Sequence, residues 1–205
     1  DRIMVEVAAI ILAAGLSRRM GKQNKLLLRV GDVPMIRRVV LTYQCALNAS
    51  VLVVTGHERA DVEAAIAGTG ATTVFNSSFE MGKQTSVSRG LASISDAPLI
   101  LIGLGDQPLL SSVELQNLVN VHKKADPELI SIPFNGEVRG NPILVPGKLR
   151  KRLLEDKITP GCMAFTRNHP ECVQFHKLDC PGFYVDIDTP DAYTILESTL
   201  SEKKY

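Results

Sequence analysis

Short apolar runs separated by amphipathic stretches constrain the fold of this chain more than any other feature. They are rich in Val, Ile and Leu without strict alternation, which is typical of strands that are buried on both faces of a sheet. The runs are Val7 to Ala14, Ser50 to Thr55, Thr72 to Asn76, Pro98 to Gly103 and Glu128 to Pro133. The pattern predicts an α/β fold: a Rossmann-like, mostly parallel sheet with helices on both faces.

The intervening stretches carry helix signals. Apolar residues recur at three- to four-residue spacing from Met35 to Leu47, which predicts a helix with one buried stripe. Ser111 followed by Glu114 has the spacing of a capping box and predicts a helix that ends near Lys124. These helices would supply crossovers between the predicted strands.

The last part of the chain is less regular. Pro and Gly become frequent from 135 to 146, which predicts a hairpin or an irregular excursion that shapes a binding pocket. Thr189 and Pro190 are suited to the N-cap and first turn of a final helix ending near Ser198. Without a repeat or a flexible linker, residues 1–205 are expected to form one domain.

Composition excludes several classes of protein. With 45% hydrophobic residues, 22% charged residues and a net charge of +1, the chain has no global field that favours nucleic acid or an anionic membrane. Its longest apolar run is too short to span a bilayer, and Asp1 to Met4 lacks the basic start of a secretory signal. We therefore expect a cytoplasmic protein. The four cysteines lack zinc or redox spacing and are expected to be free thiols.

The segment that follows the first apolar run, residues 12–25, is suited to binding an anion. Gly15 and Gly21 allow a tight turn whose N–H groups can approach a ligand. No acidic residue occurs from Val7 to Gly31, whereas four basic residues fall within eight positions: Arg18, Arg19, Lys22 and Lys25. The segment fits neither a Walker A loop nor a dinucleotide fingerprint. It predicts a triphosphate site, with a solvated basic loop as the alternative.

Several motifs together resemble those of the MobA-like nucleotidyltransferases. They are Leu-Ala-Ala-Gly-x-Ser-x-Arg-Met-Gly from Leu12, Gly-Asp-Val-Pro-Met-Ile from Gly31, Gly-Asp-Gln-Pro from Gly105 and Asp-Ile-Asp-Thr-Pro-Asp from Asp186. The motifs occur in the order expected for the family and together span nearly the whole chain. They look most like those of the members that transfer a cytidylyl group to molybdenum cofactor. The resemblance implies a fold of the nucleotide-diphospho-sugar transferase type.

The resemblance also implies a set of site residues. Arg19, Lys25 and Asp106 would be catalytic, and Asp106 and Asp186 would hold Mg²⁺. Ala14 is associated with cytidylyl transfer, whereas guanylyl-transferring relatives tend to have Gly there. The residues implied to bind the nucleotide, CTP, are Leu12, Ala13, Ala14, Gly15, Ser17, Arg18, Arg19, Lys25, Thr55, Gly56, Ser86 and Asp106.

The implied acceptor is the phosphate of a molybdopterin-type cofactor, and an apo-molybdoenzyme is an implied protein partner. Relatives often have Gly-His-Pro where this chain has Gly140-Asn141-Pro142, so the acceptor could differ, because an amide and an imidazole differ in protonation and donor number. Asp188 could instead be a helix-entry residue. The residues expected to face the acceptor are Gln107, Pro108, Gly140, Asn141 and Asp188.

The chemistry expected of the two metal-binding aspartates follows from their positions. Asp106 and Asp186 each follow an apolar run, so both carboxylates should lie at the carboxyl edge of the sheet. Mg²⁺ is typically bound by one or two carboxylates together with substrate phosphates. The acceptor phosphate is itself a nucleophile, so no catalytic base is assigned. Alternatively, Asp106 could be a turn residue before Pro108.

Two other functions remain open from the sequence. The same pocket could serve a non-catalytic protein that carries molybdenum cofactor and inserts it into an enzyme. A nicotinamide-dependent reductase on this fold is a third hypothesis, which no dinucleotide fingerprint supports. The histidines are not assigned to chemistry: His122, His169 and His176 are expected at the surface, and His57 could line the nucleotide pocket or a surface loop.

Overall fold

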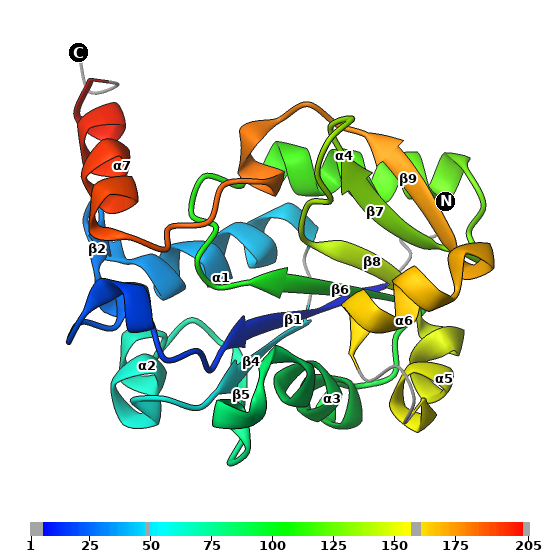
Figure 1. The fold of residues 1–205 in the computed structure, drawn as a ribbon, viewed down its shortest axis with the longest axis horizontal. Coiled ribbons are helices and arrows are strands. Elements are labelled where there is room, and N and C mark those ends of the chain that lie inside the picture. The colour runs from blue at the N-terminus through cyan, green and yellow to red at the C-terminus, as the bar shows by residue number, and fades with distance from the viewer. Residues whose placement is uncertain (1–5, 48–49, 157–160, 203–205) are drawn as a thin grey trace.

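A seven-stranded sheet lies at the centre of the molecule (Figure 1). The computed structural model describes residues 6–47, 50–156 and 161–202. The strand order across the sheet is β5-β4-β1-β6-β8-β7-β9. The strands are β1 (Val7–Ala13), β4 (Ser50–Thr55), β5 (Thr72–Phe75), β6 (Leu99–Leu104), β7 (Ile130–Phe134), β8 (Ile143–Pro146) and β9 (Val173–Lys177).

Most neighbouring strands run parallel, as the sequence predicts. β1 pairs in parallel with β4 and β6, β4 with β5, and β7 with β9. β8 is antiparallel to both β6 and β7. It forms the end of the segment predicted as a hairpin or irregular excursion, so that segment returns to the sheet. The predicted α/β class with a mostly parallel sheet is confirmed.

Helices cover both faces of the sheet because successive strand residues point to opposite sides. In β1, Ala9 and Ile11 pack into one core together with α1, α2 and α4. Ala8 and Ile10 pack into the other core, with α3, α5 and α6 (Figure 1). The helices are α1 (Met35–Leu47), α2 (Arg59–Ala65), α3 (Lys83–Ser93), α4 (Ser112–Lys124), α5 (Arg150–Glu155), α6 (Cys162–Asn168) and α7 (Pro190–Glu202).

The predicted helix starts are confirmed by their capping contacts. The Ser111 hydroxyl accepts a hydrogen bond from the Glu114 N–H, and the Glu114 carboxylate accepts one from the Ser111 N–H, which completes the capping box of α4. Thr189 caps α7 through a hydrogen bond from the Ala192 N–H at 3.2 Å. The helix continues to Glu202, one turn beyond the predicted end.

The final helix packs away from the central sheet. Leu196 of α7 contributes to a small core with Ile187, Met35 and Val30 of the hairpin formed by β2 (Arg29–Val30) and β3 (Val33–Pro34). Among the described residues, no helix combines the length and the apolar content needed to cross a lipid bilayer. The four cysteines are free thiols, as predicted.

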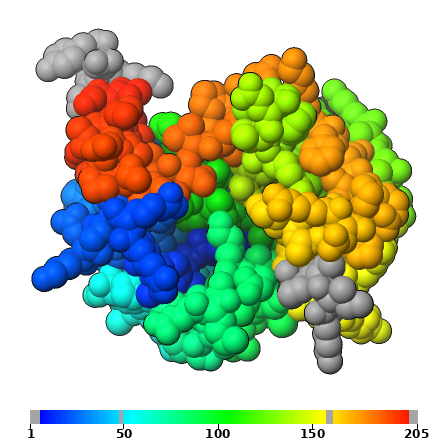
Figure 2. Space-filling view, viewed as in Figure 1, coloured from blue at the N-terminus to red at the C-terminus, as the bar shows by residue number. Residues whose placement is uncertain are grey.

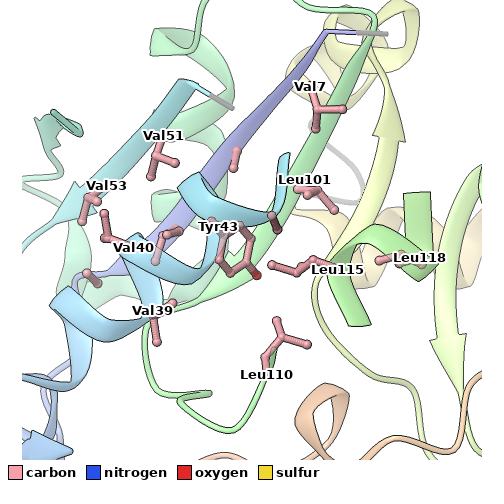
Figure 3. Packing of buried hydrophobic residues seen from close by; sticks show 14 of the residues in the cluster. Val7, Val39, Val40, Tyr43, Val51, Val53, Leu101, Leu110, Leu115 and Leu118 are labelled. Carbon is pink, nitrogen blue, oxygen red and sulfur yellow. The ribbon is translucent and has the colours of Figure 1, made fainter. Parts of the chain in front are cut away.

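Tyr43 on α1 has its ring in the core between Leu101 and Leu115 (Figure 3). Its side chain is 1% exposed, and burial raises the pKa of its hydroxyl. A Cβ at Gly103 would lie 1.9 Å from the Tyr43 oxygen, so the glycine of β6 makes room for this hydroxyl. Within the described part of the chain the hydroxyl has no hydrogen-bond partner.

We expect Tyr43→Phe to raise the free energy of unfolding by about 1 kcal/mol, because a buried hydroxyl without a partner opposes folding. Urea denaturation of the two proteins measures the difference. Gly103→Ala is the matched opposite change: its new methyl group meets the Tyr43 hydroxyl and should destabilise the protein. A clear loss of stability in Tyr43→Phe would show that the hydroxyl has a partner in solution.

His122 corrects the expectation that the histidines of this chain lie at the surface. Its side chain on α4 is 0% exposed, and its Nδ1 lies 2.8 Å from the Ser131 hydroxyl of β7. The same hydroxyl lies 2.8 Å from Nε2 of His176 on β9, and Gln174 donates a hydrogen bond to it at 3.0 Å. His122 is therefore a buried link between α4 and the sheet. His169 and His176 are partly exposed.

These histidines make stability depend on pH. Burial lowers the pKa of His122, helped by the charges of His176 and Lys123 and opposed by Asp126. Burial also lowers the pKa of His176. Since both pKa values are lower in the folded state, the unfolded state binds more protons below about pH 6.5, and stability falls as the pH drops through that range.

We expect the free energy of unfolding to decrease by about 1 kcal/mol or more between pH 7.5 and pH 5.5. Urea denaturation at both pH values measures it. In His122→Asn the decrease should be smaller, although the variant is less stable at pH 7.5. An equal decrease in wild type and variant would mean that other groups cause the pH dependence.

Candidate active site

The candidate site lies where the carboxyl ends of β1 and β6 meet. The Gly105 N–H donates a hydrogen bond to the Leu12 carbonyl at 3.0 Å, so the segments that follow the two strands start side by side. A cavity of about 270 Å³ opens between them. In Figure 2 the molecular surface is hollowed here, between the blue N-terminal part and the green part that follows β5. Parallel sheets of this kind bind ligands at this edge.

The loop after β1 folds back on itself. Ser17 is in the left-handed region, with φ 50°, and its carbonyl accepts a hydrogen bond from the Met20 N–H at 2.8 Å. Its hydroxyl accepts a second from the Lys25 N–H at 3.3 Å. Gly21 is also left-handed, with φ 69°, which favours glycine. These turns bring the backbone of Lys25 back to Ser17, near the start of the loop.

Lys25 is the centre of a charged network. Its ammonium lies 2.5 Å from Asp106 Oδ2 and also hydrogen bonds to Asp188 Oδ1. The second oxygen of Asp188 pairs with the Arg19 guanidinium at 2.7 Å. The Lys25 side chain is 13% exposed and that of Asp106 16%, whereas that of Arg19 is 69% exposed. The inner pair is therefore held firmly, and Arg19 remains accessible to a ligand.

The network keeps these groups charged. Burial acts to lower the pKa of Lys25, but the charges and hydrogen bonds of Asp106 and Asp188 outweigh it, and the pKa is raised. Burial acts to raise the pKa of Asp188, but the hydrogen bond and charge of Lys25 outweigh it, and the pKa is lowered. Near neutral pH the site therefore contains the Lys25 ammonium ion beside the ionised Asp188 carboxylate.

Asp186 reaches the same cavity from the C-terminal segment. Gln107 donates hydrogen bonds to Asp186 Oδ1 at 2.8 Å and to the Phe183 carbonyl at 3.2 Å. The Ile187 N–H donates to the Asp106 carbonyl at 2.9 Å, which joins the two aspartate segments. Loss of hydration and the negative charge of Asp106 raise the pKa of Asp186. Asp106 and Asp186 therefore lie close enough to interact.

The donor set fits Mg²⁺ better than a metal held by protein alone. Asp106 Oδ1 is buried and has no hydrogen-bond partner among the described residues, while Oδ2 is held by Lys25. In the described ranges, no group of three or more His, Cys, Asp or Glu residues could hold a metal ion. Mg²⁺ is commonly bound by one or two carboxylates and completed by phosphates and water, and a pair such as Asp106 and Asp186 fits that donor set.

The opposite wall of the cavity comes from α3 and the segment before it. Ser86 is buried, and its hydroxyl accepts a hydrogen bond from Asn76 at 2.9 Å. Gly56 allows Ala14 and Phe79 to approach, since a Cβ at this position would lie 2.7 Å from the Ala14 Cβ and 2.8 Å from the Phe79 Cβ. Thus the segments after β1, β4 and β5 meet at this wall.

A second cavity, of about 490 Å³, adjoins the first. Leu12, Lys83 and Leu104 line both cavities. The second is bounded by β6, β8, α3 and α6 and is mainly apolar. Its other lining residues are Gln84, Val87, Ile102, Asn141, Ile143, Gly161, Cys162, Met163, Ala164 and Arg167.

Comparison with known proteins identifies the family of this chain. The family model of the MobA-like NTP transferase domain matches residues 9–173, which include the loop, Ser86 and Asp106. The chain belongs to this family.

Proteins of known name also resemble the chain in sequence. A 2-C-methyl-D-erythritol 4-phosphate cytidylyltransferase of Dehalococcoides mccartyi is 29% identical over 157 residues, which are 75% of this chain and 68% of that protein. The bifunctional protein GlmU of Pseudoalteromonas atlantica is 32% identical over 126 residues, 61% of this chain. The match spans only 28% of that longer protein.

The fold of this MobA-like chain is found in a solved nucleotidyl transferase from Methanothermobacter. The two structures superimpose with a TM-score of 0.79 over 97% of this chain and 99% of the other, at 23% sequence identity. The likeness shows that the two proteins share the same fold over nearly their whole lengths.

Most residues implied by the family motifs lie together. The members of the nucleotide set that line the first cavity are Leu12, Ala14, Gly15, Ser17, Arg19, Lys25, Ser86 and Asp106. Those outside it are Ala13, Arg18, Thr55 and Gly56: Arg18 is exposed, and the other three are buried in or next to the sheet. His57 lines neither this cavity nor the second.

The residues expected to face the acceptor are dispersed. Asp188 lines the first cavity, Asn141 lines the second, and Gly140 borders a smaller cavity beside it. Gln107 is 2% exposed and lines neither of the two large cavities; it orients Asp186. Pro108 is also buried, and its carbonyl accepts a hydrogen bond from Arg38 at 3.3 Å.

Several lining residues escaped the sequence interpretation. Lys83 belongs to none of the family motifs, and its positive charge was the available signal. Phe79 also lies outside the motifs. Met163 and Arg167 lie on α6, seven residues long, which has too short an apolar pattern to indicate a ligand.

Proposed function

We propose that this protein is a Mg²⁺-dependent nucleotidyltransferase that transfers CMP from CTP to the phosphate of a molybdopterin-type cofactor and releases pyrophosphate. The observation that carries the proposal is the convergence of Arg19, Lys25, Asp106 and Asp186 on one cavity beside a glycine-bearing loop. Cations and paired carboxylates in one cavity suit a metal-bound polyphosphate. Membership of the MobA-like NTP transferase family supports the same class of reaction.

The choice of CTP rests on two observations. Ala14 lines the cavity, and alanine at this motif position resembles the cytidylyl-transferring relatives. The Dehalococcoides relative, which matches 75% of this chain, is a cytidylyltransferase. Ser86 and the backbone near Ala14 would face the base and ribose, with the triphosphate extending toward Arg19 and Lys25.

The reaction needs positioning and charge stabilisation more than a base. A phosphate oxygen of the acceptor forms a bond to the α-phosphorus of CTP, and the bond from that phosphorus to the bridging oxygen breaks as pyrophosphate leaves. Arg19 would contact the phosphates from the open side, because its guanidinium is largely exposed. Lys25 would neutralise charge at the leaving group and also fix Asp106 and Asp188.

Asp106 and Asp186 would hold the metal. Bound there, Mg²⁺ would withdraw charge from the phosphates and stabilise the departing pyrophosphate. Gln107 would keep Asp186 in place through its hydrogen bond to Oδ1. Lys25 bonds only to Oδ2 of Asp106, and Oδ1 accepts no hydrogen bond from the described residues. Oδ1 would therefore be available to the metal.

The direct test measures pyrophosphate release by a coupled absorbance assay. Purified protein is incubated with molybdopterin cofactor and CTP, GTP or ATP, with Mg²⁺ or with EDTA. We expect release with CTP and Mg²⁺ and none without acceptor. Release of pyrophosphate with GTP or ATP, but not with CTP, would overturn the choice of CTP.

The same reaction mixtures test the two other functions. Binding of the acceptor without pyrophosphate release from any nucleotide would favour a carrier that inserts the cofactor into an apo-molybdoenzyme. Oxidation of a reduced nicotinamide, followed by its absorbance, would favour a reductase. Either result would contradict the proposed transfer.

A further inference from the structure

Lys83 is the charged residue among the three that line both cavities. It lines both of them, and its positive charge acts on Asp186 and Asp188 to lower their pKa values. Its ammonium makes no hydrogen bond or ion pair with the described residues. The residue is also exposed. Lys83 can therefore contact a ligand from either side.

The placement of Lys83 on α3 also favours an anion. It is the first residue of this 11-residue helix, whose first turn contains no acidic residue. A cation at the positive end of a helix dipole is unfavourable by itself, and a bound anion removes the conflict. The charge of Lys83 and the positive end of the α3 dipole therefore both favour a negatively charged ligand group at the junction of the cavities.

The rest of the second cavity has a different chemistry. Val87, Ile102 and Ile143 supply apolar walls, which suit an uncharged ring system. Met163 is 60% exposed at the edge of the cavity, and its flexible thioether can pack on a flat ring. Arg167 lines the same cavity, and a guanidinium can stack on an aromatic face.

We propose that the second cavity binds the body of the acceptor, a heterocycle carrying a phosphomonoester, and that Lys83 binds this phosphate at the junction with the nucleotide cavity. The proposal deepens the proposed transferase function and rests on it for the identity of the reaction. It assigns acceptor recognition to Lys83, Met163 and Arg167, none of which belongs to the motifs. Lys83 would bring the attacking oxygen toward the α-phosphorus beside Asp186.

A binding experiment without nucleotide tests this assignment. The probes are a fluorescent pterin that carries a phosphomonoester and the same pterin without phosphate, each titrated with protein and followed by fluorescence anisotropy. Wild type should bind the phosphorylated probe more tightly. Lys83→Gln should weaken its binding about tenfold or more and leave the binding of the other probe unchanged.

Two further variants make the comparison specific. Lys124→Gln removes an exposed cation of α4 that lines neither cavity, and it should bind both probes like wild type. Met163→Glu places a charge at the edge of the apolar cavity and should weaken the binding of both probes. Thermal unfolding checks the fold; Lys83→Gln should unfold at or above the wild-type temperature, because it removes a cation from the helix start.

The assignment is overturned if wild type binds neither probe, if it does not distinguish them, or if Lys83→Gln binds the phosphorylated pterin like wild type. These outcomes are separate from those of the pyrophosphate assay. Pyrophosphate release with unaltered pterin binding in Lys83→Gln would retain the transfer and reject this acceptor site. Lys83-dependent binding without release would reject the transfer and retain the site.

Discussion

Asp106→Asn should lower the rate of pyrophosphate release about 10³-fold at saturating CTP and millimolar Mg²⁺. The substitution keeps the size of the side chain but removes its negative charge. Asp106 Oδ1 has no other partner in the described chain, and Oδ2 anchors Lys25. The change therefore removes the proposed metal ligand and loosens Lys25, the partly buried cation of the loop, at the same time.

Asp32→Asn is the matched control for this variant. Asp32 is an exposed carboxylate of the β2–β3 turn and lines neither large cavity, so the rate should stay within about twofold of wild type. The rate as a function of Mg²⁺ concentration adds a second readout, in which Asp106→Asn should need more metal for half-maximal activity. A wild-type rate and metal dependence in Asp106→Asn would rule out its role as a metal ligand.

Lys25→Met should lower the rate about 10²-fold or more and also destabilise the folded protein. Methionine keeps most of the apolar stem of lysine but leaves Asp106 and Asp188 without their shared counter-ion. These groups are partly buried, so we expect a loss of about 2 kcal/mol in the free energy of unfolding. Urea denaturation and the pyrophosphate assay measure the two effects.

Lys22→Met separates the particular role of Lys25 from the general charge of the loop. Lys22 lies in the same basic segment but is exposed and outside the large cavities. Its replacement should change the rate and the stability only slightly. If the two lysine variants had equal effects on the rate and on stability, the loop would act through its total charge. The proposed role of the network around Lys25 would then be wrong.

The main features of the fold follow from local patterns in the sequence. The run from Val7 is buried at both odd and even positions, so a strand covered on both faces could be predicted. Ser111 and Glu114 mark the start of α4 through contacts within one turn. β8 and β9 are harder to predict: β8 ends in a proline, and β9 is a partly exposed edge strand.

The features of the fold and of the candidate site that escaped prediction depend on contacts between separate elements. Gln107 is a positioning residue because Asp186, 79 positions away, lies beside it in the fold. His122 can be buried because Ser131 on the adjacent strand provides a polar partner. The second cavity is formed by side chains from β6, β8, α3 and α6. Such combinations have no spacing that a single sequence can reveal.

The hydrogen bonds from Gln107 to Asp186 and from Ile187 to Asp106 have a consequence for biosynthesis. A growing chain can form its first four parallel strands, and even the loop that holds Arg19, before the ribosome has made Asp186. Such an intermediate has one of the two aspartates proposed to hold the metal and lacks the other. On the proposed function, we expect activity to begin only when the segment that carries Asp186 has docked beside Asp106.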